Sequence, residues 1–267
     1  MARMGNLNVY WTSDGSPSLI FEKNLEPESI YAEKMHHSLG AWSETKYIYL
    51  PAIEVAADCD VFQDKTISVL SLGLGLGYNE LMTLALELKR KSLGHPVNFQ
   101  VHSYEVLSEL RRNFLDQLQS GQSQAYSDCY RWIFENIAKD FSIEIEDLKR
   151  MGRERIQSGE LLLLGSFPDS LPPKQEYEVL LYDAFSKKMS PELWEESFLF
   201  ETLGRHCAKD CVVSTYAATG ALKRSLLGLG FKKILRPGFS GKRDSSFYVR
   251  GNIKYEDVLS QTAVFKV

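Results

Sequence analysis

The chain has 267 residues, of which 44% are hydrophobic and 25% charged, with a formal net charge of -4 at pH 7. This composition is typical of a globular domain and argues against disorder, collagen and coiled coil. No stretch approaches the ~18 uninterrupted apolar residues of a membrane span, and the N-terminus lacks the apolar segment of a signal peptide. The charge excludes a globally basic nucleic-acid binder, so any contact with nucleic acid must be local.

The four cysteines, Cys59, Cys129, Cys207 and Cys211, are too irregularly spaced for a zinc site. Disulfides are rare in proteins that lack a secretion signal. We therefore expect reduced, buried thiols in a cytoplasmic protein with no metal and no membrane partner.

Residues 1–60 are expected to form an accessory segment ahead of the main domain. The turn residues Asp14-Gly15-Ser16-Pro17 separate two short apolar runs, residues 8–11 and 18–21, which should pair as a hairpin. A helix is expected over about 44–55, although Pro51 is unfavourable inside a helix.

Residues 61–267 alternate between strand and helix patterns. A buried strand over 66–72, a glycine cluster, a helix over 79–91 and a strand over 98–105 make a βαβ unit, which predicts a parallel sheet. Residues 108–158 are helical and charged, and about 116–158 form an expected insertion whose amphipathic stretch, residues 130–139, we interpret as packing. Further elements are expected at 160–164, 177–182, 193–203, 210–216, 220–229, 232–235 and 246–249. Because no helix separates the last two strands, they should form an antiparallel hairpin.

The glycine cluster Gly73-Leu74-Gly75-Leu76-Gly77 follows a strand and opens a helix. Tyr78 occupies the position of the third glycine of a dinucleotide fingerprint, which disfavours NAD. The G-x-G-x-G spacing resembles motif I of class I S-adenosylmethionine (AdoMet) methyltransferases; a tight turn without a ligand is the alternative. Glu105 ends the next strand, where a carboxylate can accept both ribose hydroxyls of an adenosine.

Asp183 is expected at the carboxyl end of another buried strand, the edge at which open α/β sheets bind ligands. A carboxylate there suits an amine nucleophile, because it attracts the ammonium and can accept its proton. The alternative is an N-cap for the segment that follows. Ser190 and Pro191 predict a helix start, and Trp194 just after them fits either the core or a nucleobase pocket.

Residues 222–254 hold nine basic residues against one acidic residue, Asp244. Such a stretch suits phosphate contacts, and Phe239 adds a possible stacking group. A solvated surface is the alternative.

Five ordered motifs together resemble one family, the tRNA 5-(aminomethyl)uridine methyltransferases, which form the methyltransferase half of bifunctional MnmC-type enzymes and their standalone relatives. The resemblance covers roughly residues 10–250. The motifs are residues 14–18 (DGSPS), 37–45 (HSLGAWSET), 71–79 (SLGLGLGYN), 183–194 (DAFSKKMSPELW) and 238–243 (GFSGKR).

The resemblance implies a Rossmann-like class I fold, a mostly parallel seven-stranded sheet ending in an antiparallel hairpin. It implies AdoMet-dependent methylation of the aminomethyl group on the wobble uridine of tRNA. Asp183 would hold and deprotonate the amine. The implied cofactor-binding residues are Ser71, Gly73, Gly75, Gly77, Asn79, Glu105 and Ser166. The implied substrate-binding residues are Phe185, Trp194, Phe239, Lys242 and Arg243. A separate flavin oxidase could supply the substrate, since 267 residues leave no room for one here.

Two departures keep alternatives open. Ser71 and Ser166 stand where the family has acids that help to seat the cofactor. One alternative keeps the fold and transfers a methyl or aminopropyl group to a small amine. Another is a non-catalytic RNA-binding relative. His36 and His37 are interpreted as packed or solvated rather than catalytic.

Overall fold

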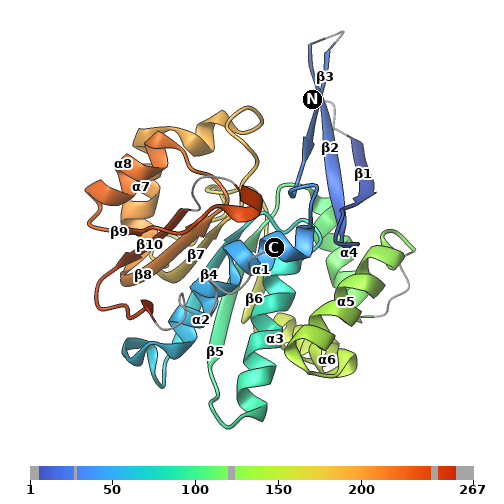
Figure 1. Cartoon of the computed structure of the whole chain (residues 1–267), viewed down its shortest axis with the longest axis horizontal. Helices are drawn as coiled ribbons and strands as arrows, with labels where there is room; N and C mark the ends of the chain where they lie inside the picture. The colour runs from blue at the N-terminus through green and yellow to red at the C-terminus, as the bar shows by residue number, and fades with distance from the viewer. Residues whose placement is uncertain (1–5, 27–28, 120–123, 242–245, 257–267) are drawn as a thin grey trace.

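A computed structural model describes residues 6–26, 29–119, 124–241 and 246–256 of the chain. Its centre is a seven-stranded sheet with the order β6-β5-β4-β7-β8-β10-β9 (Figure 1). The strands are β4 (Thr66–Leu72), β5 (Asn98–Tyr104), β6 (Leu161–Leu164), β7 (Tyr177–Tyr182), β8 (Cys207–Thr215), β9 (Lys232–Ile234) and β10 (Ser246–Arg250). Strands β4 to β8 run parallel, and β10 is antiparallel to both β8 and β9. The expected fold class and closing hairpin are confirmed.

Helices cover both faces of this sheet (Figure 1). They are α1 (Ala41–Ile48), α2 (Leu50–Asp58), α3 (Tyr78–Ser92), α4 (Ser108–Gln119), α5 (Ser127–Phe141), α6 (Ile145–Ser158), α7 (Glu196–His206) and α8 (Gly220–Gly228). Three short 3-10 turns occupy Asp60–Phe62, Pro191–Trp194 and Phe239–Gly241. Successive strand residues point to opposite faces, so Val69 joins the core shared with α1 to α6, and Leu70 joins the core under α7 and α8.

The charged helical region packs on the first of these cores. Along α5, Tyr130, Ile133, Phe134 and Ile137 are buried at the spacing of one helix face. This confirms that its amphipathic stretch serves packing. The proposed division of the chain at about residue 60 stays a prediction.

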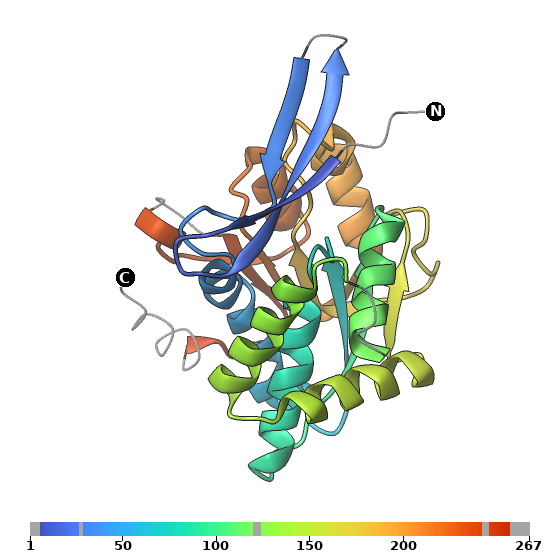
Figure 2. The ribbon, with the colours of Figure 1, turned by 90° about the vertical axis from the view of Figure 1, so that its right-hand side faces the viewer.

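A second, three-stranded antiparallel sheet projects from the central domain (Figures 1 and 2). It consists of β1 (Asn6–Trp11), β2 (Pro17–Glu26) and β3 (Ser29–Lys34). The expected hairpin is confirmed, and β3 is an additional strand. The single helix expected over 44–55 is in fact two, α1 and α2. The first helix ends before Tyr49, and the second begins at Leu50 with Pro51 in its first turn, where proline is tolerated.

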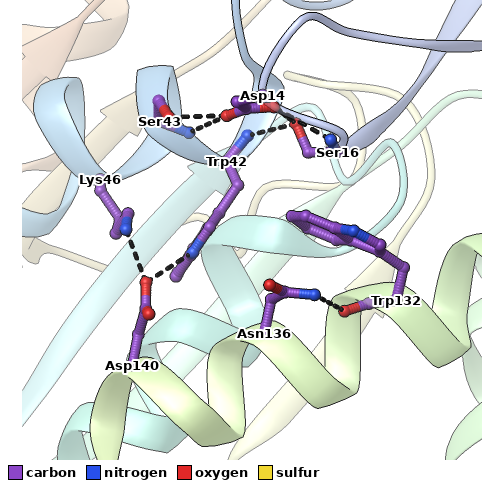
Figure 3. A network of polar contacts seen from close by, with 8 residues as sticks. All are labelled: Asp14, Ser16, Trp42, Ser43, Lys46, Trp132, Asn136 and Asp140. Carbon is purple, nitrogen blue, oxygen red and sulfur yellow. Dashed lines mark hydrogen bonds and ion pairs between the residues drawn. The ribbon is translucent and has the colours of Figure 1, made fainter. Parts of the chain in front are cut away.

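The turn between β1 and β2 is fastened to the start of α1 (Figure 3). Asp14 accepts hydrogen bonds from the backbone N–H of Ser16 (2.9 Å) and from the Ser43 hydroxyl (2.6 Å). The buried Ser16 hydroxyl oxygen accepts from the N–H groups of Ala41 (2.8 Å) and Trp42 (3.0 Å). The first N–H groups of a helix have no partner within the helix. Two of the five family-like motifs, residues 14–18 and 37–45, are therefore hydrogen-bonded to each other and have a structural role.

We expect the substitution Ser16→Ala to lower the free energy of unfolding by about 2 kcal/mol, because it leaves the buried Trp42 N–H without an acceptor and the Ala41 N–H with only the Thr12 hydroxyl at 3.4 Å. Urea denaturation followed by circular dichroism measures this change. The matched control is Ser13→Ala at an exposed position, which should cost about 0.5 kcal/mol or less. Equal losses of stability in both variants would show that the attachment of this turn to α1 does not depend on the Ser16 hydroxyl.

All four cysteines are free and buried, as expected for thiols that take part in packing. Within the described ranges, no helix has both the length and the apolar character required to cross a bilayer.

Candidate active site

A cavity of about 660 Å³ lies at the carboxyl ends of the parallel strands. The segments that follow β4 to β8 form its floor, and residues of β2, β3 and α1 form its other walls. Among its lining residues are Phe21, Glu33, His36, Glu44, Tyr49, Gly73, Gly75, Asn79, Glu105, Ser166, Asp183, Phe185 and Tyr216. Six of the predicted site residues, which follow the four strands β4, β5, β6 and β7, thus line one cavity together with Phe185.

The glycine loop between β4 and α3 lies against two neighbouring strands. The N–H of Gly73 donates to the Tyr104 carbonyl (2.9 Å). A Cβ at Gly73 would lie 2.4 Å from the Asp183 carbonyl oxygen, so no larger residue fits there. At Gly75, a Cβ would meet only the Met35 sulfur at 3.6 Å, and the position opens on the cavity. Gly73 therefore allows close packing, whereas Gly75 leaves space for a ligand.

We expect Gly75→Ala to weaken AdoMet binding at least about tenfold while the protein still folds, because the added methyl group occupies the cavity. Calorimetric titration measures the affinity. Gly94→Ala is the matched control: both glycines have positive φ (+53° and +81°), but a Cβ at Gly94 meets nothing within 4 Å. Both variants carry left-handed backbone strain of about 1 kcal/mol. Equal weakening in both would contradict a role for Gly75 in binding.

Glu105 is 6% exposed and joins the glycine loop to the end of β5. Its carboxylate accepts hydrogen bonds from the N–H groups of Gly75 (3.2 Å) and Leu107 (2.9 Å). Burial raises the pKa of this carboxyl, and these two hydrogen bonds oppose the rise. Glu105 therefore shapes the loop and also lines the cavity. Ribose binding by Glu105 stays a prediction.

Asp183 directly follows β7, and its backbone N–H donates to the Leu72 carbonyl (3.0 Å). No helix begins here, so the N-cap alternative is wrong: the next helical turn starts at Pro191, with Ser190 before it. Burial raises the pKa of the Asp183 carboxyl to about 8. Glu44 and Glu80 add to the rise by charge repulsion, whereas the polar side chains of Tyr49 and Asn79 oppose it. A cation in the cavity would favour the ionised form.

The loop after Asp183 contacts the projecting sheet. Phe185 packs on Phe21 with ring centroids 5.4 Å apart. Glu33 accepts hydrogen bonds from the backbone N–H (2.7 Å) and the hydroxyl (2.6 Å) of Ser186. These contacts hold β2 and β3 over the cavity beside Asp183.

Trp194 does not line the cavity, so the prediction that it stacks on a nucleobase is wrong. Its side chain is 1% exposed and packs edge-on against Tyr182, with centroids 5.2 Å apart. Its indole N–H donates to the Phe185 carbonyl (2.7 Å). Trp194 therefore supports the loop that carries Phe185.

Three other predicted site residues lie outside the cavity wall. Ser71 is fully buried in β4, on the side of the strand that faces Glu80 of α3. Gly77 opens α3, where a Cβ would collide with the Phe114 ring at 2.2 Å. Phe239 is 7% exposed and packs against the rings of His37 and Tyr47. Ser71 and Phe239 are buried in the interior, and Gly77 allows the Phe114 ring to pack closely; the sequence pattern alone did not distinguish such packing from ligand contact.

The basic residues of the C-terminal stretch that the structure describes do not form one patch. Arg224 pairs with Glu196 on the surface (2.6 Å), and Lys254 pairs with Asp60 (2.5 Å). Arg250 donates to the Cys207 carbonyl (2.6 Å) at the start of β8, the edge of the sheet opposite the cavity. Arg236 is buried against the Tyr47 ring. Lys242 and Arg243 lie outside the described residues, so their predicted contact with tRNA stays a prediction.

Sequence reasoning missed several cavity residues from the N-terminal segment. Glu33, Glu44 and Tyr49 line the cavity, although more than 120 residues separate each of them from Asp183. His36 also lines it, and burial lowers the pKa of its imidazole to about 4, so it is neutral at pH 7. Its Nδ1 contacts the Ser18 hydroxyl at 2.8 Å, as expected for a packed histidine.

Comparison with known proteins gives consistent results. A family model described as S-adenosyl-L-methionine-dependent methyltransferase matches residues 130–247. The chain is 26% identical over 211 residues to the tRNA 5-methylaminomethyl-2-thiouridine biosynthesis bifunctional protein MnmC of Pseudoalteromonas atlantica, covering 76% of this chain and 29% of that protein. The MnmC protein of Vibrio campbellii is 22% identical over 267 residues, covering 91% of this chain and 35% of that protein.

The solved structure of MNMC2 from Aquifex aeolicus superimposes with a TM-score of 0.61 and 22% identity, covering 98% of this chain and 77% of that one. This likeness shows the shared fold. The matched part of the chain spans about a third or less of the bifunctional relatives. The family match and these relatives support an MnmC-type, S-adenosyl-L-methionine-dependent methyltransferase domain.

Proposed function

We propose that the chain transfers a methyl group from AdoMet to the amine of a 5-aminomethyl-(2-thio)uridine at the wobble position of tRNA. The observation that carries this proposal is Asp183, a carboxylate at the end of a central strand that faces a cavity large enough for a cofactor and a modified base. The names of the MnmC relatives supply the class of substrate.

The residues of the cavity fit AdoMet. Gly75 leaves space beside the loop, and the buried Asn79 Oδ1 lacks a hydrogen-bond partner among the described residues. The methionine ammonium and the sulfonium of AdoMet are cationic, and the carboxylates of Glu44, Glu105 and Asp183 line the same cavity. We assign the glycine loop, Asn79, Glu105 and Ser166 to the cofactor. When bound, AdoMet supplies an electrophilic methyl group.

Asp183 prepares the nucleophile. A free alkyl amine has a pKa of about 10, as lysine does, so it is protonated at neutral pH and lacks the lone pair that attacks. The ionised Asp183 carboxylate attracts the ammonium, orients it and accepts its proton. The projecting sheet limits the access of water, because Glu33 and Phe21 contact the loop that follows Asp183.

The cavity also favours an amine over an anionic substrate. Glu33, Glu44 and Glu192 line it together with Asp183, against one lysine, Lys34. The tRNA is the proposed macromolecular partner, in the cytoplasm, and a separate flavin-dependent oxidase is a proposed source of the aminomethyl group.

The non-catalytic alternative loses part of its motivation. The serine at position 71 removes no charge from the cavity, because Ser71 does not line it. A small free amine as acceptor is the alternative that the experiment must separate.

The experiment is methyl transfer from radiolabelled AdoMet to tRNA that carries 5-aminomethyl-2-thiouridine, followed by nucleoside mass spectrometry. We expect methylation of that tRNA and none of the same transcript with unmodified uridine. Spermidine and putrescine are tested in parallel, without RNA. Transfer to the small amines alone would replace the tRNA substrate, and no transfer to any acceptor, with AdoMet bound, would overturn the proposal.

A further inference from the structure

Tyr49 is a buried side chain on the cavity wall that the chemistry above does not use. It lies at the break between α1 and α2, where its backbone N–H donates to the Thr45 carbonyl (2.9 Å). The side chain is 1% exposed and lines the cavity together with Asp183. The break in the helix thus places an aromatic hydroxyl beside the proposed base.

The Tyr49 hydroxyl has no hydrogen-bond partner of ordinary geometry among the described residues. A buried hydroxyl left without a partner costs about 1–3 kcal/mol, so each such group in a native structure requires an explanation. Tyr49 and Asp183 line the same cavity, so the Asp183 carboxyl is the acceptor we consider. Burial raises the pKa of Tyr49 most, and the charge of Asp183 is the next largest cause.

Four polar side chains influence the ionisation of the Asp183 carboxyl. Glu44 of α1 and Glu80 of α3 oppose its ionisation by charge repulsion, whereas the hydroxyl of Tyr49 and the amide of Asn79 favour it as donors. The charges of Glu44 and Tyr216 also raise the pKa of Tyr49. Two carboxylates thus disfavour the charged form of the base and two neutral donors favour it.

We propose that Tyr49 is a positioning residue for the methyl transfer proposed above, on which this inference rests: its hydroxyl donates a hydrogen bond to the Asp183 carboxylate, which fixes the orientation of the carboxylate and favours its ionised form. An ammonium group binds the ionised carboxylate and not the neutral acid. Tyr49 therefore sets the pH range in which Asp183 receives the amine. A phenylalanine at this position would preserve the packing of the ring and lose the donor.

The first test measures Asp183 directly in the protein without ligands. The protein is labelled with 13C at aspartate carboxyls and titrated by NMR, and the Asp183→Asn variant assigns the resonance. We expect Tyr49→Phe to lower the ionisation constant of Asp183 about three- to tenfold, which raises its pKa. Tyr130→Phe is the matched control, because Tyr130 is fully buried, has an unpartnered hydroxyl and lies outside the cavity wall.

The second test is the pH dependence of methyl transfer. We expect the rate ratio of wild type to Tyr49→Phe to fall from about tenfold near pH 6.5 to near one at pH 9, where Asp183 ionises without help. AdoMet affinity should be unchanged, and Tyr130→Phe should match the wild type at every pH. A constant ratio, or an unchanged Asp183 titration, would overturn the role of Tyr49. An inactive wild type with a shifted titration would instead contradict the proposed function alone.

Discussion

Asp183→Asn should lower kcat for methyl transfer by about 10³-fold, within the range that general acid–base catalysis supplies. Asparagine keeps the shape of the side chain and the backbone hydrogen bond to Leu72. It removes the negative charge that attracts the ammonium and the only group assigned to accept its proton. Because the amine has a pKa of about 10, little of it reacts at neutral pH without that base.

The measurement that isolates this effect is single-turnover transfer with saturating AdoMet and modified tRNA, beside a calorimetric titration with AdoMet. We expect the AdoMet affinity of Asp183→Asn to remain within about threefold of wild type, because the glycine loop and Glu105 are unchanged. Raising the pH should restore part of the activity, because solvent then deprotonates the amine.

The matched control is Asp128→Asn, the same substitution at an exposed position on α5, where Asp128 pairs with Arg131. Its kcat should equal that of wild type. Equal losses of transfer and of AdoMet affinity in Asp183→Asn would show that Asp183 binds the cofactor and does not act on the amine.

The part of the candidate site that could be predicted from the sequence consists of short motifs that follow strands. Gly73, Glu105 and Asp183 each follow a parallel strand. The carboxyl ends of parallel strands meet at one edge, so the strand pattern alone was enough to predict that these residues converge. The closing antiparallel hairpin was predicted from the same pattern, because no helix separates its two strands.

The rest of the site depends on how distant segments fold over that edge. Glu33 and Tyr49 reach the cavity because the β1–β2 turn is fastened to α1 through Asp14 and Ser16, a contact with no signal in hydrophobic periodicity. Aromatic residues were ambiguous for another reason. A large apolar ring can pack in a core or stack on a base. The structure shows that Trp194 is buried in the core.

Linear charge density was also a poor guide to surface charge. The five residues of β10 place Arg250 beside the start of β8, at the end of the parallel strands opposite the cavity. Nearby acids then neutralise Arg224 and Lys254. A cluster in sequence becomes a patch only where the fold keeps its members on one face.

Glu80→Gln should stabilise the protein in a strongly pH-dependent way. Glu80 is fully buried on α3, and one of its oxygens accepts a hydrogen bond from the Ser103 hydroxyl (2.6 Å) while the other has no partner. Burial raises the pKa of its carboxyl to about 7, against an ordinary value of 4.5. The folded state therefore binds a proton that the unfolded chain releases, and stability is lost as the pH rises from about 4.5 to 7.

At pH 5 the free energies of unfolding of the wild type and Glu80→Gln should differ by less than about 1 kcal/mol, because Glu80 is neutral when folded and little of the pH-dependent loss has occurred. At pH 8 the variant should be more stable by about 3 kcal/mol, because an uncharged amide avoids the cost of burying an anion. Urea denaturation at pH 5, 6, 7 and 8 measures the difference. Its control is Glu135→Gln, at an exposed position on α5, which should change stability little at any of these pH values.

A stability difference for Glu80→Gln that stays constant across this range would mean that the carboxyl is ionised in the folded protein at pH 5. A compensating cation near Ser71 and Ser103 would then be required, and no lysine, arginine or histidine is among the main influences on the pKa of Glu80. A difference that grows with pH would instead show that the chain tolerates a buried acid directly beneath its glycine loop at a cost in stability. Because Glu80 also repels the charge of Asp183, the same substitution should lower the pKa of Asp183, which the carboxyl titration described for Tyr49 can detect.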